Sequence, residues 1–381
     1  MHLFKSIKIT NSGKAIILQR SDGSNVRYHS TWLRDNALDP KTRDANNGQR
    51  LITLSDIPIN TYIETATLDE TGQNVFLTFL PETKKVSFSA SWLEAHAYDT
   101  KRSNIKGWIA SDLKTWGKDM SKSIPNVDYK SAKSDKTLLL QWLKSLYRYG
   151  FAKMTGGKIE SGALIQIADL FGYVRETNYG KWFEVRSEVN AINLAYTNLG
   201  LQAHTDNPYR DPVPTIQILY CLENSASGGD STVVDGFNAA IRLKDENPDY
   251  FNLLSKYCAR FEYNGDKGAH LQSRRPMIEL SPDGELIAIR FNNRSAAPIT
   301  DVPYDDMANY YKAYRTFSDI INDPALAVNF KLNPGECFIV DNTRVLHART
   351  AYSGAGTRWL QGCYVDKDGL LSTISTMLEK K

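Results

Sequence analysis

Short strand-like runs separated by turn residues constrain this 381-residue chain more than any other feature. In each run, apolar side chains alternate with polar ones or form a brief apolar stretch, and turn-forming residues lie between the runs. Helices are predicted over 138–149, 237–256 and 305–321, without the strict strand–helix alternation of a doubly wound sheet. The pattern therefore favours an antiparallel sandwich. The runs lie at 15–18, 26–28, 74–79, 86–88, 151–154, 215–222, 277–280, 286–291, 328–332, 337–341 and 359–365.

Two domains are predicted on either side of a polar interval. Residues 26–33 (VRYHSTWL) resemble residues 86–93 (VSFSASWL), and each copy should be a strand followed by a short helix whose Trp-Leu pair packs inward. Residues 104–135 are rich in Lys, Ser and Asp and show little periodicity, which suits a linker. We therefore expect a small β-rich domain over 1–103 and a larger, mainly β domain with flanking helices over 136–381.

The charge balance and the cysteines exclude several classes of protein. Lys plus Arg number 46 and Asp plus Glu 43, with no basic block that would attract nucleic acid. No apolar stretch approaches the ~18 residues of a membrane span. The four cysteines are far apart in the sequence, which argues against both a zinc knuckle and a disulfide framework. We expect a soluble cytoplasmic protein that binds a small molecule and neither nucleic acid nor membrane.

Two metal-ligating residue types, His204 and Asp206, are separated by one residue. Residues two apart in a strand point to the same face, so the two side chains can converge. His347, after the strand predicted over 337–341, is the best candidate for a third ligand. Two imidazoles and one carboxylate on one face of an octahedron leave three positions open, as in non-haem Fe(II) oxygenases. Arg358 provides a guanidinium that can pair with the carboxylate of a co-substrate.

A series of ordered motifs spans nearly the whole chain. They lie at 32–36 (WLRDN), 195–197 (AYT), 204–206 (HTD), 228–231 (GGDS), 234–237 (VDGF), 333–335 (NPG), 341–342 (DN), 346–347 (LH) and 361–364 (QGCY). With these motifs the chain resembles the γ-butyrobetaine hydroxylase branch of the Fe(II)/2-oxoglutarate oxygenases, which includes trimethyllysine hydroxylases. The resemblance implies a double-stranded β-helix, or jelly roll, in the second domain, after a small β domain.

The resemblance also implies an iron site and a co-substrate site. It implies Fe(II) as cofactor, 2-oxoglutarate and dioxygen as co-substrates, ascorbate as a candidate stimulant, and a homodimer, because relatives are commonly dimers. Many relatives have zinc-binding cysteines after the WLRDN motif, but residues 37–44 contain none, so we expect no zinc and a small domain held by packing alone. The residues that match the iron ligands are His204, Asp206 and His347, and those that match the 2-oxoglutarate site are Arg358, Ser231 and Leu219.

Aromatic residues match the positions that enclose a trimethylammonium group in this branch. A quaternary ammonium donates no hydrogen bonds, so ring faces and exclusion of water must recognise it, at about 2 kcal/mol per well-placed desolvated ring. Without the resemblance, these rings would be taken for ordinary core residues. Asn193 is a candidate polar contact in the same pocket. The matching rings are Tyr179, Phe183, Tyr196 and Tyr364.

The anionic end of the substrate is expected beside Asn293. Arg294 adds a cation where relatives tend to have an apolar residue, and Asn207 stands where they have a larger Tyr or Leu. Because an extra guanidinium and a smaller neighbour suit a phosphonate, we expect 2-(trimethylamino)ethylphosphonate as substrate, hydroxylated at C1 with release of succinate and CO2. Adjacent strand residues face opposite sides, so Asn293 and Arg294 enter the pocket together only if the chain bends there. The alternatives are hydroxylation of γ-butyrobetaine to L-carnitine and a jelly roll that binds betaines without turnover.

Overall fold

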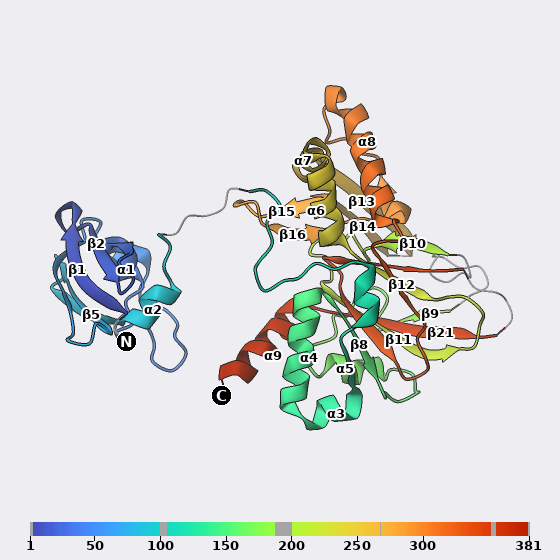
Figure 1. Ribbon diagram of the computed structural model, residues 1–381, viewed down its shortest axis with the longest axis horizontal. Helices are drawn as coiled ribbons and strands as arrows, with labels where there is room; N and C mark the ends of the chain where they lie inside the picture. The colour runs from blue at the N-terminus through green and yellow to red at the C-terminus, as the bar shows by residue number, and fades with distance from the viewer. Residues whose placement is uncertain (1–2, 100–104, 187–199, 267, 352–355, 380–381) are drawn as a thin grey trace. The chain divides into compact units, whose positions relative to one another are not determined.

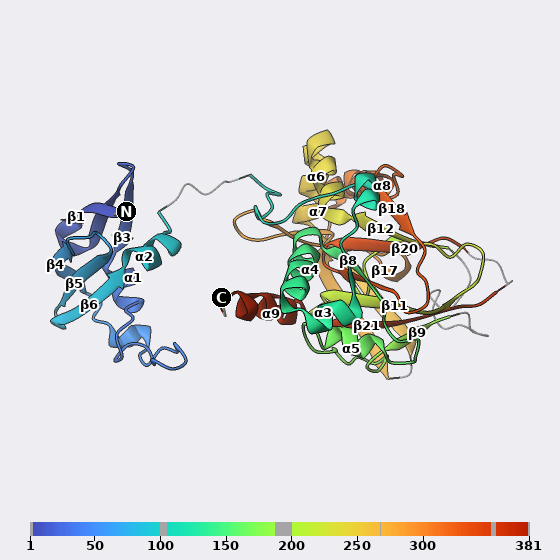
Figure 2. The same ribbon diagram turned by 60° about the horizontal axis from the view of Figure 1, so that its bottom comes forward.

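The computed structural model describes residues 3–99, 105–186, 200–266, 268–351 and 356–379. The chain splits into two compact units, Met1–Arg102 and Ser103–Lys381 (Figures 1 and 2). Within the described ranges, no helix has the length and apolar character needed to cross a lipid bilayer.

The first unit contains two three-stranded antiparallel sheets, β1-β2-β3 and β4-β5-β6. Both copies of the sequence echo are a strand followed by a short helix, as predicted, and Leu33 and Leu93 are fully buried. The elements are β1 (Phe4–Thr10), η1 (Asn11–Gly13), β2 (Ala15–Arg20), β3 (Asn25–His29), α1 (Ser30–Asp35), η2 (Leu54–Asp56), β4 (Tyr62–Leu68), β5 (Asn74–Leu80), β6 (Lys84–Ser89) and α2 (Ala90–Ala95).

Charged side chains hold the segment after α1, in addition to apolar packing. The buried Arg34 donates from Nε and Nη2 to the two carboxylate oxygens of Glu82, both at 2.7 Å. Lys84 pairs with Asp39 at 2.9 Å, and the Thr42 hydroxyl donates to the same carboxylate. These ion pairs accompany the apolar core of this unit, and packing without zinc stays a prediction.

Residues 105–135 differ from the expected linker. Trp116 is buried, and its backbone N–H donates to Asp235 while its indole N–H donates to the carbonyl of Tyr149. Strand β7 (Asn126–Asp128) runs parallel to β8 (Phe151–Thr155) in the larger sheet of the second unit. The polar composition predicted a linker, but a few buried apolar residues within this polar stretch are enough to attach it to the second unit.

Two sheets of the second unit form the jelly roll, with orders β10-β20-β12-β18 and β7-β8-β19-β11-β21-β9. The middle of strand β11, residues 218–222, is apolar because both of its faces are buried. Ile218 and Tyr220 pack under helices, whereas Leu219 and Cys221 point to the layer between the sheets. The expected antiparallel architecture with flanking helices is confirmed. The strands not yet bounded are β9 (Phe183–Val185), β10 (Leu201–His204), β11 (Ile216–Asn224), β12 (Ser231–Asp235), β18 (Ala327–Phe330), β19 (Cys337–Asp341), β20 (Val345–Arg349) and β21 (Arg358–Val365).

The helices of the second unit form two groups, visible in Figures 1 and 2. The first group covers the six-stranded sheet, with Trp142 and Leu143 of α4 in its core. The second group packs beside a long hairpin, β13 (Cys258–Asp266) and β14 (Ala269–Pro276). The first group consists of α3 (Tyr129–Ser134), α4 (Lys136–Tyr149), α5 (Leu164–Ala168) and α9 (Lys367–Glu379), and the second of α6 (Gly236–Glu246), α7 (Pro248–Lys256) and α8 (Tyr304–Ile321). The short helix η3 (Lys118–Lys122) contacts β18 of the four-stranded sheet. The remaining elements of the unit are β15 (Ile278–Leu280), β16 (Leu286–Ile289), η5 (Asn293–Ser295) and β17 (Ala296–Ala297).

Candidate metal centre and substrate pocket

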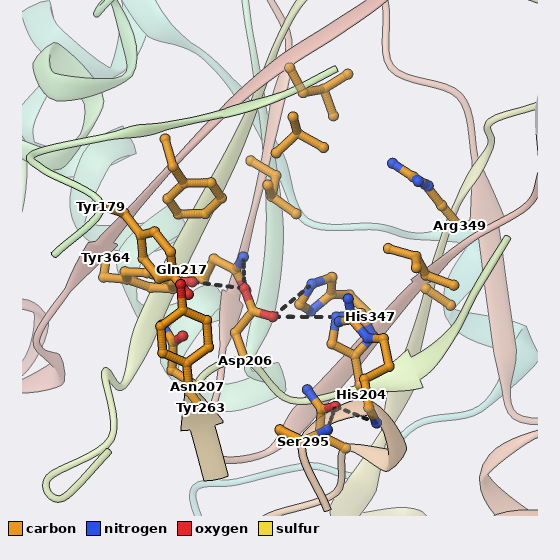
Figure 3. A pocket seen from close by; sticks show the side chains of 18 of the residues that line it. Tyr179, His204, Asp206, Asn207, Gln217, Tyr263, Ser295, His347, Arg349 and Tyr364 are labelled. Atoms are coloured by element: carbon orange, nitrogen blue, oxygen red, sulfur yellow. Dashed lines mark hydrogen bonds and ion pairs between the residues drawn. The ribbon is translucent and has the colours of Figure 1, made fainter. Parts of the chain in front are cut away.

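Strand pairing brings the two histidines together. In the antiparallel pair β10–β20, His204 lies directly opposite His347, and their ring centroids are 4.4 Å apart. Asp206 completes the group: its Oδ1 lies 3.3 Å from Nε2 of His204 and 3.9 Å from Nε2 of His347. One ligand atom from each residue lies within 4.8 Å of the others (Figure 3). A single cation can therefore contact all three.

The backbone around Asp206 differs from the predicted strand. Strand β10 ends at His204, so Asp206 does not project from the same strand face. The backbone N–H of Thr205 instead donates to the carbonyl of Phe291, and that of Asp206 donates to the side chain of Asn342. Residues far away in the sequence therefore set the position of the carboxylate.

Neighbouring side chains orient the candidate ligands. The Oδ2 atom of Asp206 accepts hydrogen bonds from Gln217 Nε2 at 2.7 Å and from the hydroxyl of Tyr364 at 2.9 Å, so Oδ1 faces the histidines (Figure 3). Nδ1 of His204 lies 2.7 Å from the carbonyl oxygen of Gln202, and donation there leaves the Nε2 lone pair for a metal. Such supporting hydrogen bonds are typical of metal ligands, and the donor set fits Fe(II).

The protonation states also suit a divalent cation. Burial, with a contribution from His204, lowers the pKa of His347 to about 3, so its imidazole is neutral at neutral pH. For Asp206, burial opposes ionisation, but the neighbouring His204 and His347 side chains outweigh it and lower the pKa of the carboxyl. Arg294 adds to the lowering of both pKa values. A neutral imidazole and an ionised carboxylate are the forms that bind metals.

A cavity of about 400 Å³ opens beside the three residues. It brings together most of the side chains that the sequence singled out. Asn193 and Tyr196 lie outside the described residues. The predicted residues that line the cavity are Tyr179, Phe183, His204, Asp206, Asn207, Leu219, Ser231, Arg294, His347, Arg358 and Tyr364.

The residues expected around 2-oxoglutarate also line the cavity. Leu219, Ser231 and Arg358 are buried, and Nε of Arg358 donates to the carbonyl of Gly229 at 3.2 Å. A second buried arginine, Arg349, lines the same cavity and was not predicted. The signal was present in the sequence, because Arg349 follows His347 by two residues on β20 and so shares its face.

Five of the rings that line the cavity form a connected group that we call the aromatic wall: Tyr179, Phe183, Tyr209, Tyr263 and Tyr364. Their centroids are 5.1 to 6.1 Å apart in successive pairs, and the hydroxyls of Tyr179 and Tyr209 lie 3.0 Å apart. Sequence reasoning missed Tyr209 and Tyr263. Tyr263 lies on the charged hairpin strand β13, where nothing in the local pattern indicates a pocket.

The chain bends at η5, and the bend separates Asn293 from Arg294. Asn293, predicted as a substrate contact, does not line the cavity: its amide donates to Gln202 and accepts from the hydroxyl of Tyr314. Arg294 lines the cavity instead. Asn207 also faces the cavity, with a positive φ of 52°. Its Oδ1 accepts from Tyr209, and its buried Nδ2 makes no hydrogen bond within the described part of the chain.

Comparisons with known proteins agree with this geometry. Residues 110–364 match the model of the taurine catabolism dioxygenase TauD, TfdA family. The chain is 34% identical over 355 residues to a γ-butyrobetaine dioxygenase of Pseudomonas sp. (strain AK-1), covering 93% of this chain and 91% of that one. The human γ-butyrobetaine dioxygenase is 30% identical, covering 93% and 92%. The mitochondrial trimethyllysine dioxygenase of Gallus gallus is 31% identical, covering 91% and 82%.

The fold and the site together define a 2-oxoglutarate-dependent dioxygenase that uses Fe(II) and dioxygen. The chain belongs to the taurine catabolism dioxygenase TauD, TfdA family, and its curated relatives lie in the γ-butyrobetaine and trimethyllysine branch. A solved structure of an asparagine oxygenase with Fe(II), 3-hydroxyasparagine and succinate aligns with a TM-score of 0.49 at 18% identity, over 62% of this chain and 81% of that chain.

Proposed function

We propose that this dioxygenase hydroxylates a C–H bond of a small zwitterion that has a trimethylammonium group at one end, with γ-butyrobetaine as the substrate. The aromatic wall beside the metal centre is the observation that carries the proposal. The names of the relatives at 34% and 30% identity support γ-butyrobetaine over the phosphonate that Arg294 and Asn207 suggested. Hydroxylation of γ-butyrobetaine would give carnitine.

Each part of the cavity has a distinct task in this proposal. His204, Asp206 and His347 bind Fe(II), and Arg358 pairs with the distal carboxylate of 2-oxoglutarate. The rings of the aromatic wall surround the trimethylammonium group, where desolvated ring faces attract a cation. Bound iron and 2-oxoglutarate supply the oxidation of the C–H bond by dioxygen, with release of succinate and CO2.

Side chains of the cavity position the substrate. Tyr364 connects the two ends of the cavity, since its ring belongs to the aromatic wall and its hydroxyl donates to Asp206. A substrate whose cation lies against this ring is therefore kept close to the metal centre. Asn207 lines the cavity, and its Nδ2, which has no hydrogen-bond partner among the described residues, can donate to the anionic group of the substrate.

A second candidate substrate, 2-(trimethylamino)ethylphosphonate, is favoured by one observation. Arg294 lines the cavity, and its charge reaches Asp206 and His347. A guanidinium donates pairs of hydrogen bonds to a doubly charged phosphonate. This candidate keeps the same metal centre and aromatic wall and differs only in the anionic group.

The test compares three compounds with purified protein, Fe(II) and 2-oxoglutarate, and measures succinate and hydroxylated product. We expect coupled formation of both with γ-butyrobetaine and background levels with 4-aminobutyrate, which lacks the methyl groups. A higher kcat/KM for the phosphonate, lost selectively in Arg294→Ala, would transfer the assignment to the second candidate. Absence of succinate with every trimethylammonium compound would leave a binding function without turnover and contradict the proposal.

A further inference from the structure

The metal-binding segment leaves its strand before its last ligand. After β10 ends at His204, the backbone of Thr205 and Asp206 has four polar groups to satisfy. The N–H of Thr205 donates to a backbone carbonyl, that of Phe291, at 2.8 Å. The other three groups bind the side-chain amides of two buried asparagines, Asn292 and Asn342.

Asn342 holds the backbone of Asp206 on both sides. Its Oδ1 accepts from the N–H of Asp206 at 2.7 Å, and its Nδ2 donates to the carbonyl of Asp206 at 2.9 Å. The Nδ2 group also donates to the carbonyl of Pro214 at 2.9 Å, so every N–H of this amide is used and its orientation is fixed. Asn342 lies in the turn between β19 and β20, five residues before His347. It therefore ties one candidate metal ligand to the strand that carries another.

Asn292 connects the same segment to the turn that carries Arg294. Its Nδ2 donates to the carbonyl of Thr205 at 3.0 Å. Its Oδ1 accepts from the backbone N–H groups of Arg294 at 3.0 Å and Ser295 at 3.3 Å, which caps η5. The position of Arg294 in the cavity is thus linked to the position of the metal-binding segment.

We propose that Asn342 and Asn292 are positioning residues that set the metal affinity of this enzyme. Neither side chain is a metal ligand; both hold the backbone of the segment that carries Asp206. Because the carboxylate does not lie on a strand, no ladder hydrogen bonds would keep it opposite the histidines if the amides were removed. The inference concerns the metal centre alone and is independent of which zwitterion is the substrate.

The first test measures Mn(II) affinity, as a redox-stable substitute for Fe(II), in Asn342→Ala without substrate or 2-oxoglutarate. Loss of a group that orients a ligand typically weakens metal binding by about 10- to 100-fold, and we expect a loss in that range. Asn238→Ala is the matched control: its Nδ2 donates to the carbonyl of Trp116 at 2.8 Å, it does not line the cavity, and it should keep wild-type metal affinity. A folded Asn342→Ala protein with wild-type Mn(II) affinity would overturn the proposal.

A second variant keeps the proposal testable if Asn342→Ala does not fold. In Asn292→Ser, the hydroxyl can still cap η5 but is too short to reach the carbonyl of Thr205. We expect weaker Mn(II) binding than in wild type, while the melting temperature of the metal-free protein changes no more than in Asn238→Ala. Wild-type Mn(II) affinity in Asn292→Ser would show that the amide contact to Thr205 has only a structural role, and would contradict the proposal.

Discussion

The two ends of the cavity are built by different means. At the metal end, polar atoms are fixed one by one: both oxygens of Asp206 have assigned neighbours, and its backbone is held by Asn342. At the aromatic wall, rings contact rings, and the hydrogen bond between Tyr179 and Tyr209 links hydroxyls rather than the surfaces that would face a cation. The metal end should therefore be sensitive to the loss of single atoms, whereas the aromatic wall should depend on ring surface.

The largest effect is expected from removal of a metal ligand. His347→Ala deletes one of three donors, so Mn(II) affinity and succinate formation should fall by more than about 100-fold, beyond the effect of losing a supporting group. Circular dichroism should show a retained fold. Succinate formation near the wild-type rate would mean that the third ligand is a different residue.

The next largest effect is expected at the predicted 2-oxoglutarate site. Arg358→Gln removes the cation expected to pair with 2-oxoglutarate, and loss of a buried charge partner costs about 2–5 kcal/mol, or roughly 30- to 5,000-fold in affinity. The KM for 2-oxoglutarate should rise accordingly, with little change in the KM for the zwitterion. Equal increases in both KM values would place Arg358 outside the 2-oxoglutarate site.

A smaller effect should show whether the aromatic wall acts through its ring surfaces or through its hydroxyl groups. Tyr179→Leu removes a ring from the aromatic wall, and at about 2 kcal/mol per desolvated ring the KM for γ-butyrobetaine should rise about 30-fold. Tyr179→Phe keeps the ring and loses only the hydrogen bond to Tyr209, so its KM should rise no more than about threefold. If the Phe variant were as impaired as the Leu variant, the wall would act through its hydroxyl groups.

The smallest effect is on stability as a function of pH. His347 in the metal-free fold has a pKa of about 3, whereas the unfolded chain binds that proton near pH 6.5. The unfolded state therefore binds more protons between these values, and the free energy of unfolding falls as the pH is lowered from 7 to 5. The melting temperature of metal-free wild type should fall more over this range than that of His347→Gln. Parallel decreases in the two proteins would contradict a buried neutral imidazole.

Much of the second unit was predictable because its central strands are buried on both faces. The predicted run 337–341 coincides with β19, and the run 215–222 overlaps β11 (Ile216–Asn224). The hairpin strand β13 was missed, since Arg260 and Glu262 give it the pattern of a solvated segment. The conformation of β13 depends on its partner strand and on the helices beside it, and these contacts cannot be predicted from the local sequence.

Residues of the site could be predicted from the sequence where their chemical role, such as binding a metal, allows only a few residue types. The spacing of His204 and Asp206, the candidate His347 and the family resemblance together predicted the cluster of these three residues. Gln217 was missed, and Asn342 was noted only as part of the DN motif, because an amide that positions a ligand has no local signature; its role depends on which segments meet in the fold. The placement of Asn293 and Arg294 likewise depends on the bend at η5.

We infer that three side chains distant in the sequence bind one Fe(II) and leave open positions for 2-oxoglutarate. The most direct measurement is anaerobic addition of Fe(II) and 2-oxoglutarate, followed by visible absorption spectroscopy. We expect a charge-transfer band in wild type that is absent in Asp206→Ala and His347→Ala and present in Asn238→Ala. A wild-type protein that binds Fe(II) without such a band, or an equal band in the Asp206→Ala variant, would contradict this inference.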